Sequence, residues 1–407
     1  MLGAIAEGRT RIEGFLNSED TRATINALRL MGVEIETNAS TISIEGVGLH
    51  GLTAPGEPLN LANSGTSVRL FAGLLSGQSF DSQLLGDESL MQRPMRRITD
   101  PLQQMGAQIH CTKAGTLPIR ITGNTKLTGI TYVMPVASAQ LKSAILLAGL
   151  YASGKTCVIE PAVTRDHSER MLSQFGCAIE KQDNKICISP QRLRAQDISI
   201  PADISSAAFF MVAALIVPGS DLLLENVGIN PSRHAVIEIL RLMGADITLE
   251  NEKIMSGEPI ANIRVRYSQL SGIEIPPALV PIAIDEFPVL MIAAACARGE
   301  TLLSQAAELR IKESDRIRAM CEGLQALGVG VEEREDGMRV QGGTLTGGAV
   351  DSHTDHRIAM SFAVAALAAS ATVTVRDCAN VNTSFPEFVD CFNTLGLPVT
   401  VTGVAHG

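Results

Sequence analysis

The sequence predicts an α/β (or α+β) protein with two lobes, and three observations lead to this prediction. Of its 407 residues, 45% are hydrophobic and 19% are charged, which is typical of a folded globular chain. One helix-and-strand unit recurs six times along the sequence. At about 150 residues per domain, the chain is long enough for two or three domains with cores of their own.

Each unit contains a helix that runs into a glycine and is followed by a short β-prone segment. The six glycines are Gly32, Gly106, Gly176, Gly244, Gly328 and Gly396, separated by 74, 70, 68, 84 and 68 residues. Glycine just past a helix adopts positive φ, which lets the chain leave the helix and enter a strand. The regular spacing therefore predicts six copies of one structural unit.

A second, more apolar helix is expected in five of the units. These helices are predicted at residues 67–77, 139–154, 206–219, 286–299 and 356–369. Their polar starts suit N-caps and lie in Asn63–Thr66, Ser138–Gln140, Asp203–Ser206, Asp285 and Thr354–His356. Each unit is thus predicted as helix, strand, helix, strand, with extra β-prone stretches such as 117–121 and 263–267. The apolar helices are expected to be buried.

Six units divide most simply into two lobes of three, residues 1–199 and 200–407. The break is expected near residues 197–201, because an apolar helix pattern resumes at Asp203. Aligning residues 2–10 with residues 148–156 indicates that Met1 falls inside the opening helix of the first unit, so that this unit is truncated. A cleft between two lobes is the usual place for a site.

Charge and composition exclude several functional classes. The 33 Lys and Arg against 43 Asp and Glu give a net charge of −10, and no basic cluster with interleaved aromatic residues is present, so we expect no nucleic-acid partner. The longest apolar run, residues 144–152, is far shorter than the roughly 20 residues of a membrane helix. Residues 1–7 do not resemble a signal peptide, and we expect a cytoplasmic protein.

The eight cysteines are dispersed, with no CxxC pair and no zinc-ligand spacing. We expect reduced thiols, most of them filling the core, and no metal site. P-loop, GxGxxG, HExxH and GxSxG motifs are absent, which weakens the common nucleotide-binding, metalloprotease and hydrolase interpretations.

The polar clusters at helix starts are the candidate ligand-binding groups. Asn63, Gly65 and Thr66 combine free backbone N–H groups with a close approach at glycine and the positive end of a helix dipole, which suits a phosphate or carboxylate. Ser138 and Gln140 begin a similar helix. An ordinary capped helix accounts for both clusters equally well.

Cationic side chains occur at comparable places in different units. They are Arg93 before Pro94 at a predicted first helical position, Arg165, Lys312, Arg316 and Arg357. An arginine at a helix start opposes the helix dipole, so a purely structural role explains it poorly. A solvated charged face is the alternative for residues 310–316, but several such cations beside helix starts favour an anion site.

Two carboxylates are candidates for proton transfer. Asp285 opens a helix that has Pro288 in its first turn, and an N-cap is the alternative interpretation. Glu313 lies between Lys312 and Ser314, where a surface ion pair is the alternative. His356 follows Asp355 and is interpreted either as a ligand contact or as a capping residue.

Seven motifs together resemble the 5-enolpyruvylshikimate-3-phosphate synthase family. They are LANSGTSVRL (61–70), GDESLMQRPM (86–95), PVASAQLKS (135–143), RDHSER (165–170), IKESDR (311–316), DHRIAM (355–360) and TSFP (383–386). The motifs occur in the family's order and span most of the chain. The resemblance implies a two-lobed, inside-out α/β barrel of six βαβαββ repeats, three per lobe.

The resemblance also implies a reaction. The family transfers the enolpyruvyl group of phosphoenolpyruvate to the 5-hydroxyl of shikimate 3-phosphate and releases phosphate, without metal or organic cofactor. It assigns phosphoenolpyruvate contacts to Gly65, Arg93, Arg316 and Arg357, shikimate 3-phosphate contacts to Ser138, Arg165, Asp285 and Lys312, and contacts with both to Gln140. Asp285 is then the proton acceptor for the 5-hydroxyl, and Glu313 handles the proton at the methylene carbon. We expect a monomer in the shikimate pathway.

Two departures from the family pattern are visible. A Pro-Gly-Asp-Lys-Ser-x-Ser-His-Arg segment is expected ahead of Met1 and is not in the sequence, so low turnover is expected for this chain as it stands. Thr383 occupies a position where some members have a lysine.

Two rival interpretations are kept. One is the sister transferase acting on UDP-N-acetylglucosamine, although residues 86–92 lack its reactive cysteine. The other is a truncated ligand-binding homologue with impaired catalysis.

Overall fold

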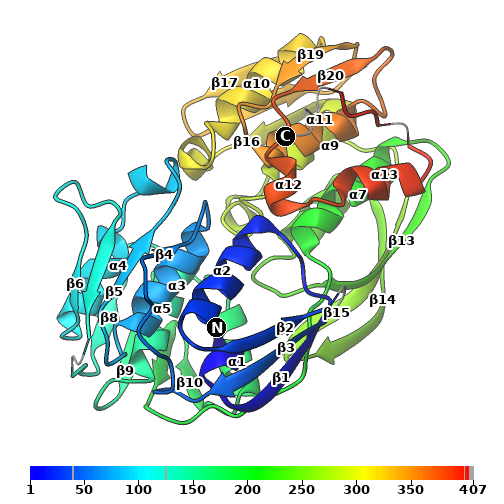
Figure 1. Ribbon diagram of the computed structural model, residues 1–407. Coiled ribbons are helices and arrows are strands. Elements are labelled where there is room, and N and C mark those ends of the chain that lie inside the picture. Colours follow the sequence, from blue (N-terminus) through cyan, green and yellow to red (C-terminus); the bar gives the residue numbers. More distant parts are fainter. Residues whose placement is uncertain (39–40, 124–125, 398, 403–407) are drawn as a thin grey trace. The chain divides into compact units, whose positions relative to one another are not determined.

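The computed structural model describes residues 1–38, 41–123, 126–397 and 399–402, and its chain forms two compact units (Figure 1). Unit 1 consists of Met1–Ile200 together with Ile254–Glu258, and unit 2 consists of Pro201–Lys253 and the chain from Pro259 onward. The expected division into residues 1–199 and 200–407 did not include a return of the chain to the first unit. The returning segment, residues 254–258, contains the end of one strand of unit 2, a turn and the start of the next strand.

Unit 1 alternates helices and short strands. Its helices are α1 (Leu2–Ile5), α2 (Glu19–Leu30), α3 (Gly65–Leu75), η1 (Leu90–Gln92), α4 (Arg96–Gln104), α5 (Ala139–Gly149) and α6 (His167–Gln174). Its strands are β1 (Glu7–Glu13), β2 (Glu34–Thr37), β3 (Thr41–Val47), β4 (Leu59–Asn60), β5 (Ser82–Leu85), β6 (Gln108–His110), β7 (Ile119–Thr122), β8 (Thr131–Val133), β9 (Thr156–Ile159), β10 (Ile179–Gln182), β11 (Lys185–Ile188) and β12 (Ile198–Ser199).

The described strands of unit 1 form three sheets with one common plan. Their orders are β12-β1-β3-β2, β4-β5-β7-β6 and β10-β11-β9-β8, each with one parallel pair and two antiparallel pairs. In the second and third sheets, the first strand of the parallel pair, β4 or β8, is separated from its partner, β5 or β9, by a single helix. In the first sheet that place is taken by β12, which pairs Ile198 with Ile12 from the far end of the unit.

Unit 2 repeats this alternation of helices and strands. Its helices are α7 (Ile204–Ile216), α8 (Ala235–Leu242), η2 (Pro277–Leu279), α9 (Phe287–Cys296), η3 (Ala307–Ile311), α10 (Arg316–Ala326), α11 (His356–Ala365), α12 (Val381–Ser384) and α13 (Phe388–Thr394). Its strands are β13 (Asp221–Gly228), β14 (Asp246–Met255), β15 (Glu258–Arg266), β16 (Glu300–Leu303), β17 (Gly330–Arg334), β18 (Gly337–Gln341), β19 (Gly348–Asp351) and β20 (Val373–Arg376).

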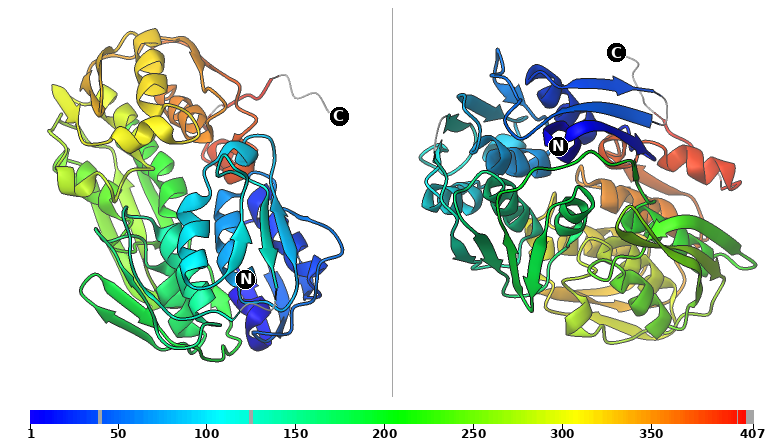
Figure 2. Two further views of the ribbon diagram at one scale, coloured as in Figure 1. Left: turned by 90° about the vertical axis from the view of Figure 1, so that its left-hand side faces the viewer. Right: turned by 90° about the horizontal axis from the view of Figure 1, so that it is seen from below.

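The sheets of unit 2 follow the plan seen in unit 1. The described orders are β13-β15-β14, β16-β18-β17 and the parallel pair β19-β20, and α10 packs on β17 and β19 (Figure 2). Parallel bridges from Ala202 to Val227 and from Glu274 to Leu302 stand where a fourth strand would lie. The strand expected after Gly396 includes Pro398, which lies outside the described residues.

The six helix-terminating glycines adopt the predicted conformation. Gly32, Gly106, Gly176, Gly244, Gly328 and Gly396 have φ between 73° and 96°. A side chain is rarely accommodated at such φ, so glycine is required at each helix exit. The sixfold unit inferred from the spacing is therefore confirmed at the backbone level.

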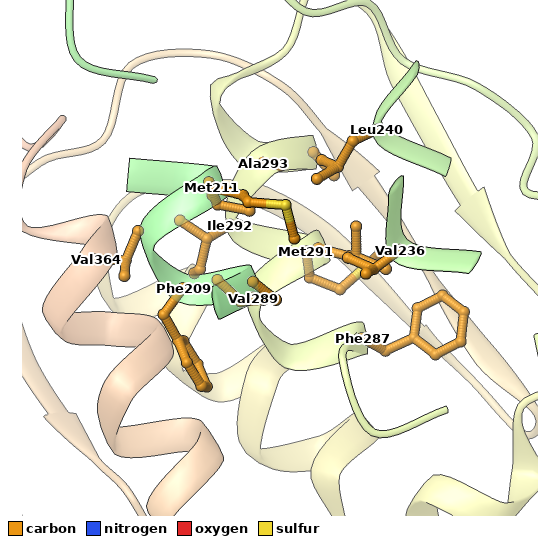
Figure 3. Packing of buried hydrophobic residues seen from close by; sticks show 14 of the residues in the cluster. Phe209, Met211, Val236, Leu240, Phe287, Val289, Met291, Ile292, Ala293 and Val364 are labelled. Carbon is orange, nitrogen blue, oxygen red and sulfur yellow. The ribbon is translucent and has the colours of Figure 1, made fainter. Parts of the chain in front are cut away.

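Each unit buries its most apolar helices, as the sequence predicts. In unit 2, α7, α9 and α11 pack against one another, and Phe209, Met291 and Val364 lie in their common core (Figure 3). In unit 1, α3 and α5 cross closely at Gly73, where a β-carbon would lie 2.1 Å from the carbonyl oxygen of Ala144. Glycine is therefore required at this crossing.

Two sequence-based expectations about single residues are wrong. Pro94 is not the first residue of a helix, because α4 begins at Arg96 with Met95 as its N-cap. Cys157 and Cys187 form a disulfide instead of remaining reduced, because they lie directly opposite each other on β9 and β11. Their separation of 30 residues concealed this register in the sequence. The remaining cysteines of the described chain are free thiols, as expected.

In the part of the chain that the structure describes, every helix is too short or too polar to cross a membrane.

Candidate functional site

In unit 1 the predicted residues gather at the start of α3. The Arg93 guanidinium donates to Oδ1 of Asn63 at 2.8 Å, and Nδ2 of Asn63 donates to Asp87 at 2.7 Å. These two bonds fix the Asn63 amide beside Ser64, whose hydroxyl caps the helix by accepting from the N–H of Ser67. The helix start therefore presents its dipole beside a fixed arginine, as an anion site requires.

Gly65, Thr66 and Gln140 complete this cluster. A β-carbon at Gly65 would lie 3.2 Å from Nη1 of Arg93, so a larger residue would crowd the guanidinium. Nε2 of Gln140 donates to the Thr66 hydroxyl at 2.9 Å, while the Arg69 guanidinium donates to Oε1 of Gln140. With both ends bonded, the Gln140 amide has one defined orientation.

Several arginines and carboxyl groups lie near the start of α3 in unit 1. Burial lowers the pKa of Arg69 to about 10, and the neighbouring Arg93 and Arg97 act in the same direction. Asp20, at the start of α2, faces this group: burial raises its pKa, while Ser64 and Arg93 oppose the rise. An anion at this helix start would pair with Arg69, Arg93 and Arg97, which lie near the carboxyl groups of Glu19, Asp20 and Asp87.

Ser138 and Arg165 belong to the neighbouring repeat of unit 1. The Ser138 hydroxyl caps α5 by accepting from the N–H of Leu141 at 3.3 Å. Arg165 lies in the loop between β9 and α6, directly before the N-cap Asp166. A 2.6 Å hydrogen bond between the hydroxyls of Ser143 and Ser168 ties α5 to α6.

Unit 2 brings its candidate residues together at the starts of α9, α10 and α11. In the described chain no side chain caps α9, and its N-cap position is Glu286, so the interpretation of Asp285 as an N-cap is wrong. Oδ1 of Asp285 lies 3.4 Å from Nζ of Lys312 and 3.6 Å from Nη1 of Arg316. A carboxylate between two cations and near a helix start is placed to meet a polar substrate.

Arg316 is the buried centre of this site, with 1% of its side chain exposed. Its Nε lies 2.8 Å from Asp355, and its Nη2 donates to Glu313 at 2.7 Å. Asp355 is fully buried, caps α11 through the N–H of Arg357 at 2.9 Å, and accepts from Ser314 at 3.0 Å. The solvated-face interpretation is therefore wrong for Arg316.

Arg310, in contrast, supports the local fold. Its guanidinium donates to Asp315 at 2.8 Å, to Glu333 at 2.9 Å and to the carbonyl of Glu335 at 2.7 Å. These bonds join η3 to the β17–β18 hairpin.

Arg357 is held by two residues at the start of α9, Asp285 and Glu286. Its Nη1 donates to the carbonyl oxygen of Asp285 at 2.9 Å and lies 3.8 Å from the buried carboxyl of Glu286. Burial raises the pKa of Glu286, while Arg357 and Arg233 oppose that rise. Arg233 also lies 3.3 Å from Asp203, the side-chain cap of α7.

Two groups of unit 2 have protonation states suited to proton transfer. Burial, assisted by Arg357, lowers the pKa of His356 to about 4, so its imidazole is neutral near pH 7. Burial is the largest influence on the pKa of Glu313 and raises it, but Arg316, a backbone hydrogen bond and His356 together bring the net shift downward. Glu313 is thus a carboxylate that can accept a proton.

The structure also adds residues that the sequence-based reasoning had missed as site groups. They are Asp20 and Arg69 in unit 1, and Asp203, Arg233, Glu286 and Asp355 in unit 2. Arg69 could have been found, because it lies one helical turn beyond Gly65 and Thr66 and so shares their face. Among the described residues, no three His, Cys, Asp or Glu side chains are grouped to hold a metal ion.

Comparison of this geometry with solved structures first defines a class. The enolpyruvyl transferase NikO from Streptomyces tendae superimposes with a TM-score of 0.75 over 98% of this chain and 91% of that chain. At 17% identity this match shows the fold alone, the two-lobed α/β architecture of enolpyruvyl transferases. Anion-ready helix starts and a carboxylate–cation network are in keeping with that class.

More similar proteins define the family. EPSP synthase from Acinetobacter baumannii matches with a TM-score of 0.93 and 52% identity, over 99% of this chain and 93% of that one. The 3-phosphoshikimate 1-carboxyvinyltransferases of Methylococcus capsulatus and Alkalilimnicola ehrlichii are 59% and 58% identical, covering 99% and 100% of this chain and 92% of each relative. Residues 1–392 match the family EPSP synthase (3-phosphoshikimate 1-carboxyvinyltransferase). The chain belongs to this family of enzymes, and the alternative of a UDP-N-acetylglucosamine transferase is not favoured.

Proposed function

We propose that this protein transfers the enolpyruvyl group of phosphoenolpyruvate to the 5-hydroxyl of shikimate 3-phosphate and releases phosphate. In the addition step, the 5-hydroxyl oxygen bonds to C2 of phosphoenolpyruvate while a proton adds to its methylene carbon. In the elimination step, the bond from C2 to the phosphate oxygen breaks and the new methyl group loses a proton. Both substrates are anions, which is why cations and helix starts are needed to bind them.

The proposed binding roles are those that the family resemblance implies. Gly65, Arg93, Arg316 and Arg357 are assigned to phosphoenolpyruvate, Ser138, Arg165, Asp285 and Lys312 to shikimate 3-phosphate, and Gln140 to both. Support for these roles comes from the fixed Asn63–Arg93 and Thr66–Gln140 bonds in unit 1. The predicted monomeric state and cytoplasmic location stay predictions.

One observation carries the proton-transfer roles: Asp285 does not cap α9 but lies between Lys312 and Arg316. Lys312 is assigned to shikimate 3-phosphate and Arg316 to phosphoenolpyruvate, so Asp285 lies beside the groups proposed to hold both reacting molecules. In the proposal Asp285 accepts the proton of the 5-hydroxyl as the new bond forms. Glu313 moves the proton at the methylene carbon, and the neutral His356 lies within the same network.

The test is phosphate release from phosphoenolpyruvate and shikimate 3-phosphate by wild type, Asp285→Asn and Asp221→Asn. Removal of a general base lowers turnover about 10²–10⁴-fold, so Asp285→Asn should lose that factor while keeping the wild-type urea transition. Asp221 lies on β13 of the same unit, where its half-exposed carboxylate pairs with Arg264. Its substitution should therefore leave turnover unchanged.

Two results would contradict the proposal. One is wild-type turnover by a folded Asp285→Asn variant, which would remove Asp285 from the proton path. The other is phosphate release by the wild-type chain with UDP-N-acetylglucosamine in place of shikimate 3-phosphate.

A further inference from the structure

Unit 1 contains a buried ionic cluster that the proposed chemistry does not use. Lys142 on α5 is fully buried, and its Nζ lies 2.6 Å from Glu169 on α6 and 3.2 Å from Glu160 after β9. Glu160 and Glu169 are 3% and 7% exposed. We name these three residues the Lys142 triad.

The two glutamates of the Lys142 triad flank the Arg165 loop in the sequence. Glu160 precedes Arg165 by five residues and Glu169 follows it by four, so both ends of the loop are attached to one ammonium group. The loop is bonded internally too, since the Thr164 hydroxyl donates to the Glu160 carboxylate. Asn184 in turn donates to the carbonyl of Glu160 at 2.7 Å.

The other end of the Lys142 triad leads to the start of α5. Lys142 follows Gln140 by two residues and Ser138 by four, and its backbone N–H donates to the carbonyl of Ser138 at 3.1 Å. The ammonium group therefore links the Arg165 loop with the helix turn that carries Ser138 and Gln140. These are the unit 1 groups assigned to shikimate 3-phosphate.

Neither stability nor direct charge attraction explains this cluster well. Burying three charged groups is costly, and replacing such a cluster by apolar residues is often neutral or stabilising. Two carboxylates against one ammonium leave the cluster with excess negative charge, which would repel an anionic substrate. Burial raises the pKa of Glu169, and Lys142 opposes that rise.

We propose that Lys142, Glu160 and Glu169 are positioning residues, which fix Arg165 at the spacing from Ser138 and Gln140 that shikimate 3-phosphate needs. This inference rests on the proposed function for its ligand. The ion pairs act through Arg165 and do not touch the substrate. A planar guanidinium binds phosphate well only when its fork is held in place.

The test separates positioning from stability by three variants. Lys142→Met removes the cation and should weaken both folding and shikimate 3-phosphate binding, the latter about 10–100-fold, comparable to loss of one charge-assisted contact. The neutral triple variant Lys142→Met/Glu160→Gln/Glu169→Met should recover the urea midpoint but not the affinity. Lys155→Met is the matched control, because Lys155 and Glu180 are also 2.6 Å apart but 46% and 65% exposed.

Calorimetry with shikimate 3-phosphate and hydrogen exchange of residues 160–170 are the two measurements. Wild-type affinity in the triple variant would overturn the proposal, because restored folding alone would then suffice. A wild-type chain that binds no shikimate 3-phosphate would instead refute the proposed function. In that case exchange decides on the Lys142 triad: residues 160–170 should exchange at least about tenfold faster in the triple variant, whose urea midpoint is restored, than in Lys155→Met, and equal rates would overturn the positioning role.

Discussion

The two sites use the same backbone element but different side-chain chemistry. In unit 1 the starts of α3 and α5 carry uncharged polar groups, Asn63, Thr66, Ser138 and Gln140, beside arginines. In unit 2 the starts of α9, α10 and α11 carry carboxylates interleaved with cations, with Arg316 bonded to Glu313 and Asp355. Helix starts of both units thus carry the candidate residues, and the residue types decide how each start is used.

This difference separates two tasks. Amides and hydroxyls hold a substrate without changing protonation, whereas carboxylates and a neutral imidazole held beside arginines can accept and return protons. Unit 1 is suited to binding and orientation, and unit 2 to binding combined with acid–base chemistry. The comparison predicts that charge-neutralising substitutions act differently in the two units.

The largest effect is expected from Arg316→Met in unit 2. The substitution leaves the fully buried Asp355 without its cation, and breaking a buried ion pair costs about 3–5 kcal/mol of unfolding free energy. Urea denaturation measures this loss. Arg318→Met is the control, because the Arg318–Glu322 pair is 67% and 44% exposed and should be worth no more than about 0.5 kcal/mol. Equal losses in the two variants would show that the Arg316 network is not stabilising unit 2.

A smaller effect is expected from truncating one binding cation in each unit. Arg165→Ala and Lys312→Ala should each weaken shikimate 3-phosphate binding by about 1.5–3 kcal/mol, or about 10–150-fold, because a charge-assisted contact is lost. Calorimetry gives the affinities. The exposed Lys181→Ala in unit 1 and Lys253→Ala in unit 2 are controls for net charge. Unchanged affinity in both site variants would remove the two residues from the site.

A third effect is a pH dependence confined to unit 2. His356 has a folded pKa of about 4, below its unfolded value of 6.5, so between these values the unfolded state binds more protons. Its contribution to stability is therefore complete above about pH 6.5 and is lost toward pH 4, with a slope of up to about 1.4 kcal/mol per pH unit.

His356→Gln should reduce this slope of unfolding free energy against pH by up to about 1.4 kcal/mol per pH unit, which corresponds to one bound proton. Urea unfolding across the same pH range measures the slope. His110→Gln, at an exposed position on β6, is the control for loss of an imidazole. A slope that is unchanged in His356→Gln would show that His356 does not cause the acid sensitivity between pH 4 and 6.5.

The fold was largely predictable because its signals are local. Each helix exit needs a glycine with positive φ, and each apolar helix begins after a polar cap, so spacing alone indicated six units. The start of α9 is the exception, since Asp285 had the local features of an N-cap but pairs with Lys312 and Arg316. Local sequence cannot show that a distant cation competes for a carboxylate.

The site was predictable only where its residues lie in motifs at helix starts. Glu286 joins Arg357 and Arg233 across more than 50 residues in each case, and Cys157 joins Cys187 through strand register. Asp20 approaches Arg93 only after α2 and α3 have packed. Such contacts depend on the tertiary structure, so no spacing rule in the sequence indicates them.

The placement of β12 has a consequence for how the protein is made. Strand β1 is synthesised long before its parallel neighbour β12, which pairs Ile198 with Ile12 and is the last strand of unit 1 in chain order. The turn Ile254–Glu258, which also belongs to unit 1, follows later still. Unit 1 therefore has an open sheet edge during translation of nearly half of the chain, from residue 13 to residue 198, and its last segment, residues 254–258, is synthesised within unit 2. Contacts of such long sequence separation slow folding and leave a nascent strand edge open to mispairing.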